Sequence, residues 1–93
     1  MKLVYTDEAI KDLQRLREFI AVHNPPAATR IAAELVGKIE LLPDFPQIGT
    51  PVGLAPAPES VRDMVFGKNV VRYSVHSSAI IILRVWHGLE GER

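Results

Sequence analysis

The stretch VVRYSVHSSAIIILRVWHG (Val70–Gly88) decides the fold, because it is rich in the β-branched and aromatic residues that favour pleated strands. Two small polar residues, Ser77 and Ser78, divide it into two candidate strands. A third candidate strand precedes it, across a turn at Gly67-Lys68-Asn69. The last third of the chain therefore predicts a meander of three antiparallel strands: Val61–Phe66, Val70–His76 and Ile80–Trp86.

The first half of the chain has helical spacing. After a strand-like run, Lys2–Tyr5, Thr6 or Asp7 can cap a helix. Apolar residues then recur three or four positions apart, as they do on one face of a helix: Ile10, Leu13, Leu16, Phe19 and Ile20. We expect the charged residues among them to lie elsewhere around this helix: Lys11, Asp12, Arg15 and Glu18. Asn24 and Pro25 then start a second helix, whose apolar residues are Ala28, Ile31, Leu35, Ile39 and Leu42.

The order strand, helix, helix, strand, strand, strand predicts an α+β fold. The short break between the helices favours an antiparallel helical hairpin, and the N-terminal strand and the meander form one antiparallel sheet packed on it. Between them lies a loop, Leu42–Pro58, with five prolines and two glycines. The 93 residues fit one domain, residues 1–93.

The composition argues against several classes of protein. Lysine plus arginine total 11, as do aspartate plus glutamate, so a net charge of zero does not predict charge-driven nucleic-acid binding. The absence of cysteine removes disulfides and thiol chemistry and fits a reducing cytoplasm. The longest apolar run, Ala79–Leu83, is too short to span a membrane, and no signal peptide is expected.

Strand parity predicts which side chains share a face of the sheet. If an odd loop, Ser77-Ser78-Ala79, joins the last two strands, two apolar sets align toward the helices: Val71, Tyr73 and Val75 with Ile81, Leu83 and Val85. This register places Arg72 opposite Arg84 on the outer face, where like charges repel. It also pairs Val70 with Trp86 and Ser74 with Ile82. A two-residue turn at Gly67-Lys68 would place Asp63 opposite Arg72 and offset the repulsion, with Arg62, Met64 and Phe66 toward the helices.

The outer face predicted in this way is both apolar and cationic. Ile80, Ile82 and Trp86 would be exposed there, beside Arg72 and Arg84. A single arginine on a strand is usually a solvated or ion-paired surface residue. Two arginines beside exposed apolar side chains instead resemble a protein-binding site.

The residues show no motif that establishes enzyme chemistry. His23, His76 and His87 lack the spacing of metal ligands, so neither a metal nor another cofactor is predicted. His87, near arginines at a strand end, could be a general acid–base group or a hydrogen-bonded strand end. Helix capping and solvation account for the acidic residues of the first helix, Asp7, Glu8 and Asp12.

Four segments, taken in their order and spacing, resemble the RelE/ParE superfamily of toxins from bacterial type II toxin–antitoxin systems. They are DLQRLREFIAVHNPPAA (Asp12–Ala28), LLPDFPQIG (Leu41–Gly49), VRDMVFG (Val61–Gly67) and IILRVWHG (Ile81–Gly88). The resemblance implies a compact β-α-α-β-β-β fold. It also implies a cognate antitoxin, with which such a toxin can form a hetero-oligomer.

Two activities are known in this superfamily. RelE-like members cut messenger RNA on the ribosome with basic side chains and, in some members, a histidine or tyrosine, whereas ParE-like members inhibit DNA gyrase. Here Asn69-Val70 stands where members often have an aromatic residue followed by arginine. Leu89-Glu90 stands where an arginine often follows the histidine. The order of Pro46–Gly49 and of Val85–Gly88 is more similar to ParE.

The leading interpretation is a ParE-like toxin, of the plasmid-stabilisation type, that inhibits DNA gyrase and arrests growth unless an antitoxin neutralises it. For contact with target or antitoxin the candidates are Arg72, Arg84, Trp86, Ile80, Ile82 and Arg93. One alternative is a RelE-like ribosome-dependent messenger endoribonuclease that uses Arg62, Arg72, Arg84 and His87. A further alternative is a non-toxic module that only binds an antitoxin.

Overall fold

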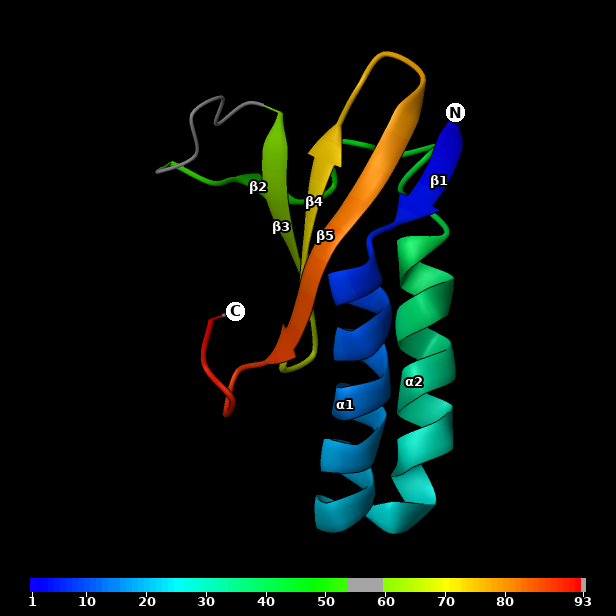
Figure 1. The fold of residues 1–93 in the computed structure, drawn as a ribbon, viewed down its shortest axis with the longest axis vertical. Helices are drawn as coiled ribbons and strands as arrows, with labels where there is room; N and C mark the ends of the chain where they lie inside the picture. Colours follow the sequence, from blue (N-terminus) through cyan, green and yellow to red (C-terminus); the bar gives the residue numbers. More distant parts are fainter. Residues whose placement is uncertain (54–59, 93) are drawn as a thin grey trace.

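Two antiparallel helices cover one face of a five-stranded sheet (Figure 1). The computed structural model describes residues 1–53 and 60–92. The strand order is β1-β5-β4-β3-β2, and the chain's elements follow in this order: β1 (Lys2–Tyr5), α1 (Asp7–His23), α2 (Pro25–Ile39), β2 (Thr50–Pro51), β3 (Val61–Phe66), β4 (Asn69–Val75) and β5 (Ala79–His87).

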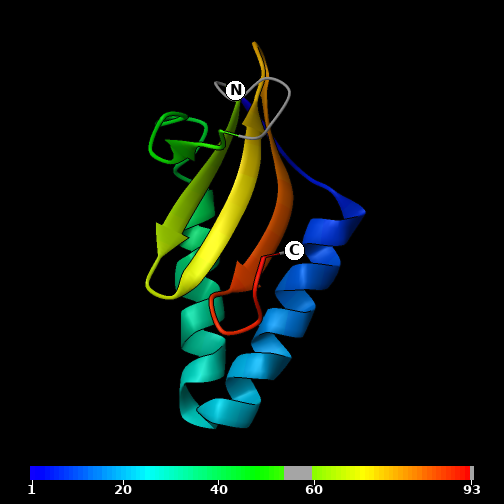
Figure 2. The same ribbon diagram turned by 90° about the vertical axis from the view of Figure 1, so that its left-hand side faces the viewer.

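The predicted α+β class is confirmed, with two changes to the sheet. The first strand, β1, pairs with β5 in parallel rather than antiparallel fashion, from Lys2 opposite Ala79 to Tyr5 opposite Ile82. The short strand β2 comes from the proline-rich loop and pairs with β3. Figure 2 shows the sheet in front of both helices. The end of the helical hairpin at which α1 joins α2, here called the hairpin tip, extends below the β3–β4 turn.

Thr6 joins the start of α1 to the sheet. Its hydroxyl accepts the Ala9 N–H at 3.0 Å and lies 3.0 Å from the carbonyl oxygens of both Ile82 and Leu83. The predicted start of α2 at Pro25 is also confirmed, although the Asn24 side chain makes no capping hydrogen bond. Thr6, the predicted cap of α1, therefore also fixes this helix to β5.

The core lies between the helices and the inner face of the sheet. The buried residues of α1 are Ala9, Asp12, Leu16 and Ile20, so the prediction that Asp12 is solvated was wrong, and Ile10 is 46% exposed. From α2 and its C-terminal extension, Leu35, Ile39 and Leu42 are fully buried. They pack in one cluster with residues of the sheet: Met64, Val71, Tyr73, Ile80, Ile82 and Val85.

A β-bulge divides β5 into two halves of opposite parity. Arg72 lies opposite Arg84 and Val70 opposite Trp86, as predicted, but the register shifts between Arg72 and Tyr73. Tyr73 then lies opposite Ile82, which leaves Leu83 as the extra residue. The His76 N–H donates to the Ala79 carbonyl at 2.9 Å, so the turn is Ser77-Ser78, one residue shorter than the predicted loop, and the bulge restores the expected pairing of the arginines.

The bulge overturns the predicted exposure of the apolar outer residues. Ile80 and Ile82 are 0% exposed and belong to the core, because the parity before the bulge turns them toward the helices. Ser74 pairs with Ile81 rather than Ile82 for the same reason. Trp86 stays on the outer face but is only 6% exposed, since the Arg72 guanidinium lies over its ring at 5.1 Å.

The β3–β4 hairpin has the predicted register. Phe66 pairs with Asn69 across the two-residue turn, and Asp63 lies opposite Arg72. Gly67 has φ +60°, a conformation that L side chains rarely adopt. This turn lies at the lower end of the sheet, and the helical hairpin extends further down (Figures 1 and 2). Asn69 follows the turn as the first residue of β4.

The described part of the Leu42–Pro58 loop is held by Tyr73. The Tyr73 hydroxyl donates to the Pro46 carbonyl at 2.8 Å and accepts the Gly49 N–H at 2.9 Å. Arg62 donates to the Gly49 carbonyl at 2.7 Å. Residues 54–59 of the predicted loop lie outside the described residues. Among the described helices, none is long and apolar enough to cross a membrane.

The contacts of Gly49 predict that alanine is not tolerated there. A Cβ at this position would lie 2.7 Å from the Asp63 carbonyl oxygen and 2.9 Å from the Tyr73 hydroxyl. We expect Gly49→Ala to lower the free energy of unfolding by about 2 kcal/mol, as overpacking in a core does. Urea denaturation measures the change.

Gly37, inside α2, is the matched control, because a Cβ there meets nothing within 4 Å. Gly37→Ala should raise the free energy of unfolding by about 0.5–1 kcal/mol, since alanine is the better helix former. Equal effects of the two substitutions would contradict the close packing of Gly49.

Candidate functional site

The Asp12 carboxylate, which is 2% exposed, lies at the centre of a buried ion-pair network. Its Oδ2 accepts from Arg84 Nε at 2.7 Å and from the Val85 N–H at 2.9 Å. Its Oδ1 accepts from Arg84 Nη2 at 3.0 Å and from Arg15. Two arginines and a backbone amide therefore surround a single carboxylate of α1.

Arg15 extends this network to the C-terminal segment. Its Nε donates to the Glu90 carboxylate at 2.8 Å, and its Nη2 donates to the Val85 carbonyl at 3.0 Å. The other oxygen of Glu90 accepts the His87 N–H at 2.9 Å. The segment after β5 is thus fastened to α1 by charge-assisted hydrogen bonds.

The network controls the ionisation of Asp12. Burial by itself would raise the pKa of the Asp12 carboxyl. The hydrogen bonds from Arg84, Arg15 and the Val85 N–H favour the charged form more strongly and lower the pKa from 3.8 to about 2. The carboxylate is therefore ionised at neutral pH, as its two cationic neighbours require.

Arg72 is held on the outer face by a second set of carboxylates. Its Nε and Nη2 donate to the two oxygens of Asp63 at 2.8 and 2.9 Å, and its Nη1 donates to Glu92 at 2.7 Å. The hydrogen bonds to Asp63 are the largest cause that raises the pKa of Arg72 above its ordinary value. Although Arg72 and Arg84 are opposite in the sheet, they bind different carboxylates: Asp63 and Glu92 for one, Asp12 for the other.

The structure does not gather the four residues that were candidates for RNA cleavage. Strand parity puts Arg72 and Arg84 on the outer face and Arg62 and His87 toward the helices. Arg62 binds the Gly49 carbonyl, whereas the His87 ring lies 5.1 Å from the Phe19 ring of α1. Of the predicted contact residues, Ile80 and Ile82 are in the core, and Arg93 lies outside the described residues.

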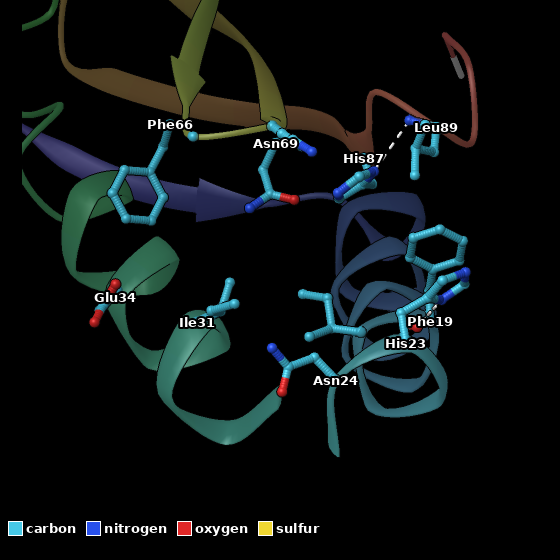
Figure 3. Close-up of a pocket in the computed structure, with 12 residues that line it drawn as sticks. Phe19, His23, Asn24, Ile31, Glu34, Phe66, Asn69, His87 and Leu89 are labelled. Carbon is cyan, nitrogen blue, oxygen red and sulfur yellow. Dashed lines mark hydrogen bonds between the residues drawn. The ribbon is translucent and has the colours of Figure 1, made fainter. Parts of the chain in front are cut away.

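A pocket of about 470 Å³ opens between the hairpin tip and the lower end of the sheet (Figure 3). Phe19 and His23 of α1 line it, together with Phe66, Asn69 and His87 of the sheet. Within residues 1–53 and 60–92, no group of three or more His, Asp or Glu side chains could hold a metal ion. The chemistry of this site is therefore that of an apolar pocket with a few polar groups.

Sequence reasoning missed both Asp12 and this pocket. The signal for Asp12 was present, because it has helical spacing with three buried residues, Ala9, Leu16 and Ile20. An acidic residue on such a stripe needs cationic partners. Helical spacing places Arg15, three residues further along, beside Asp12. Nothing in the spacing of the sequence identified Arg84, since 72 residues separate it from Asp12.

Comparison with known proteins shows similarity along nearly the whole chain. The family model described as "ParE toxin of type II toxin-antitoxin system, parDE" matches residues 3–91. Toxin RelE1 of Caulobacter vibrioides is 32% identical over 84 residues, which cover 88% of this chain and 87% of that protein. Toxin RelE2 of the same organism is 32% identical over 87 residues, covering 92% and 93%.

Solved structures share the fold. The chromosomal ParDE system from P. aeruginosa contains a chain that matches with a TM-score of 0.79 and 23% identity, covering 94% of this chain and 95% of that one. The toxin–antitoxin complex RelBE2 from Mycobacterium tuberculosis contains one with a TM-score of 0.67 and 23% identity, covering 92% and 88%. At this identity the likeness concerns the arrangement of the backbone.

The pKa of Asp12 predicts an acid-labile component of stability. The pKa is lower in the folded protein, about 2, than its ordinary value of 3.8, so folding favours the ionised form. At 1.36 kcal/mol per pKa unit, this difference contributes about 2 kcal/mol, present above about pH 5 and lost as the pH falls to about 2. Urea denaturation at a series of pH values measures it.

Asp12→Asn isolates this component. The variant should lose about 3 kcal/mol of stability at pH 7, because two arginines lose their buried partner, and its stability should depend less on pH below pH 5. Asp44→Asn, at an exposed loop position, controls for the loss of one carboxyl group. If the free energy of unfolding falls equally with pH in the wild-type protein and in Asp12→Asn, a group other than Asp12 causes the acid lability.

Proposed function

Because the chain belongs to the ParE toxin family of type II toxin–antitoxin systems, we propose that residues 1–93 form one toxin domain that inhibits DNA gyrase by binding it. We further propose that a cognate antitoxin neutralises it. The two 32%-identical relatives are named as toxins, and both structural matches come from toxin–antitoxin systems.

The observation that carries gyrase binding over RNA cleavage is the state of the arginines. Stabilising the charge that develops on a scissile phosphate requires cations aimed at one point. Within the described residues, Arg72 and Arg84 are each bound to carboxylates, and His87 faces away from both. This arrangement supports a toxin that acts by occupying a protein surface.

The same ion pairs suggest how an antitoxin would engage the outer face. The Glu92 side chain is 67% exposed and accepts one hydrogen bond from Arg72, whereas Asp63 accepts two. An acidic residue of the antitoxin could therefore replace Glu92 on Arg72 without breaking the Asp63 pair. Arg72, whose guanidinium covers the Trp86 ring, and Arg84 remain our candidates for this contact.

The second candidate function is ribosome-dependent cleavage of messenger RNA. The names of the two relatives, Toxin RelE1 and Toxin RelE2, favour it. In that case Arg62, Arg72, Arg84 and His87 would have to act through a rearrangement that releases the arginines from their carboxylates.

A gyrase supercoiling assay tests the proposal. Purified chain titrated into the reaction should abolish supercoiling of relaxed plasmid. The same chain preincubated with its cognate antitoxin should not. Absence of inhibition at every soluble concentration would contradict the gyrase proposal.

Primer extension on translated messages separates the alternatives. After induction of the chain in cells, codon-positioned cuts would show the ribonuclease activity. Growth without arrest, together with a stable complex with the antitoxin, would show a binding module that is not toxic.

A further inference from the structure

The pocket at the hairpin tip contains a buried polar atom that has no partner. Asn69 is 5% exposed, and its Oδ1 is the one buried side-chain oxygen or nitrogen of the described residues that makes no hydrogen bond. Backbone pairing with both Phe66 and His87 fixes the position of Asn69. A buried acceptor without a donor is costly, so this oxygen is suited to a ligand that supplies an N–H group.

Aromatic rings form the wall of the pocket beside Asn69. Phe19 lies 4.3 Å from the His23 ring and 5.1 Å from the His87 ring, measured between centroids (Figure 3). Both imidazoles use Nδ1 within the protein, His23 with the Phe19 carbonyl at 2.9 Å and His87 with the Leu89 N–H at 3.0 Å. Their rings are thereby oriented to pack against a flat, apolar group.

The charges at the pocket favour a neutral ligand. Lys68 and Glu34 both line it and have opposite signs. An anionic ligand would be attracted by Lys68 and repelled by Glu34, and a cationic ligand would meet the reverse. The pocket therefore combines an apolar body, one buried acceptor and no net charge.

We propose that this pocket binds the tryptophan side chain of a partner polypeptide. Indole is neutral and flat, and its single polar group is an N–H donor with no acceptor, which matches Asn69 Oδ1. The partner is a polypeptide because an apolar side chain that lines the pocket, Leu89, is 73% exposed, and Val22, which precedes His23 in the sequence, is 80% exposed. Exposed apolar groups around a pocket are typical of protein interfaces.

This inference is independent of the proposed gyrase target. It concerns the edge of the helix-facing side of the sheet, whereas Arg72 and Arg84 lie on the outer face. A negative result here would leave the supercoiling experiment unaffected, and the reverse also holds.

Two peptides that differ by one methyl group test the proposal. The full chain, labelled with ¹⁵N, is titrated with the peptide Ac-Gly-Ser-Trp-Ser-Gly-NH₂ and with the same peptide carrying 1-methyltryptophan, which lacks the indole N–H. We expect the amide signals of Gly67, Lys68 and His87 to shift. The tryptophan peptide should bind on the order of threefold to tenfold more tightly, the range for one hydrogen bond to a buried acceptor.

Asn69→Leu removes the acceptor while keeping the shape of the side chain. The two peptides should then bind with nearly equal affinity. Should this variant fail to fold, Ile31→Trp provides a second test, because it fills the pocket from α2 and should prevent binding of either peptide. Each variant's fold is checked by its amide spectrum.

Three results would overturn the proposal. They are equal affinities of the two peptides for the wild-type chain, unchanged binding to Ile31→Trp, and an absence of shifts around the pocket at millimolar peptide. A titration with free indole distinguishes the source of the ring. If indole binds and the tryptophan peptide does not, the site takes a small heteroaromatic molecule and the partner-polypeptide proposal is wrong.

Discussion

The buried carboxylate of Asp12 is the constraint on which the rest of the structure depends. The strand β1 ends at Tyr5 opposite Ile82, whereas β5 continues to His87. Beyond Ile82, the edge of β5 that faces β1 has no neighbouring strand among the described residues, so its backbone N–H and C=O groups need other partners. Side chains at the start of the chain's first helix take the place of that strand. Asp12 accepts the Val85 N–H, Arg15 donates to the Val85 carbonyl, and Thr6 bonds to the Leu83 carbonyl.

Once Asp12 is committed to the edge of β5, its charge determines where the arginines go. Arg84 turns over the edge toward α1, which separates it from Arg72 despite their opposite positions in the sheet. Arg72 is then free to bind Asp63 and to cover Trp86. The acidic residues after β5, Glu90 and Glu92, complete both groups of charges. A chain of zero net charge thus neutralises Arg72 and Arg84 locally, which is why we favour binding over phosphate chemistry in the proposed function.

Local signals predicted the elements well. Gly67, the alternation of β3 and β4, and the Asn24-Pro25 boundary each act within a few residues, and each led to the observed structure. The bulge at Leu83 was not predictable, because it depends on how two strands and the helices pack together. A single extra residue moved Ile80 and Ile82 into the core and removed two side chains from the predicted binding surface. The pocket at the hairpin tip was equally beyond local reasoning, since its lining comes from both helices and three segments of the sheet region.

By itself, the sequence determined the order of the two helices and of β1, β3, β4 and β5, the β3–β4 turn, and the pairing of Arg72 with Asp63. These features follow from periodicity, caps and turn residues, whose effects extend only over neighbouring positions. The predicted pairing of Arg72 with Arg84 was observed only because the bulge at Leu83 offset the shorter turn between β4 and β5. The tertiary structure alone decided that Asp12 is a buried partner of Arg15 and Arg84, and that Asn69 places an unpaired oxygen beside aromatic rings. Apart from the local Asp12–Arg15 pair, those contacts join segments far apart in the chain, and their energies depend on burial, which exists only when the chain is folded.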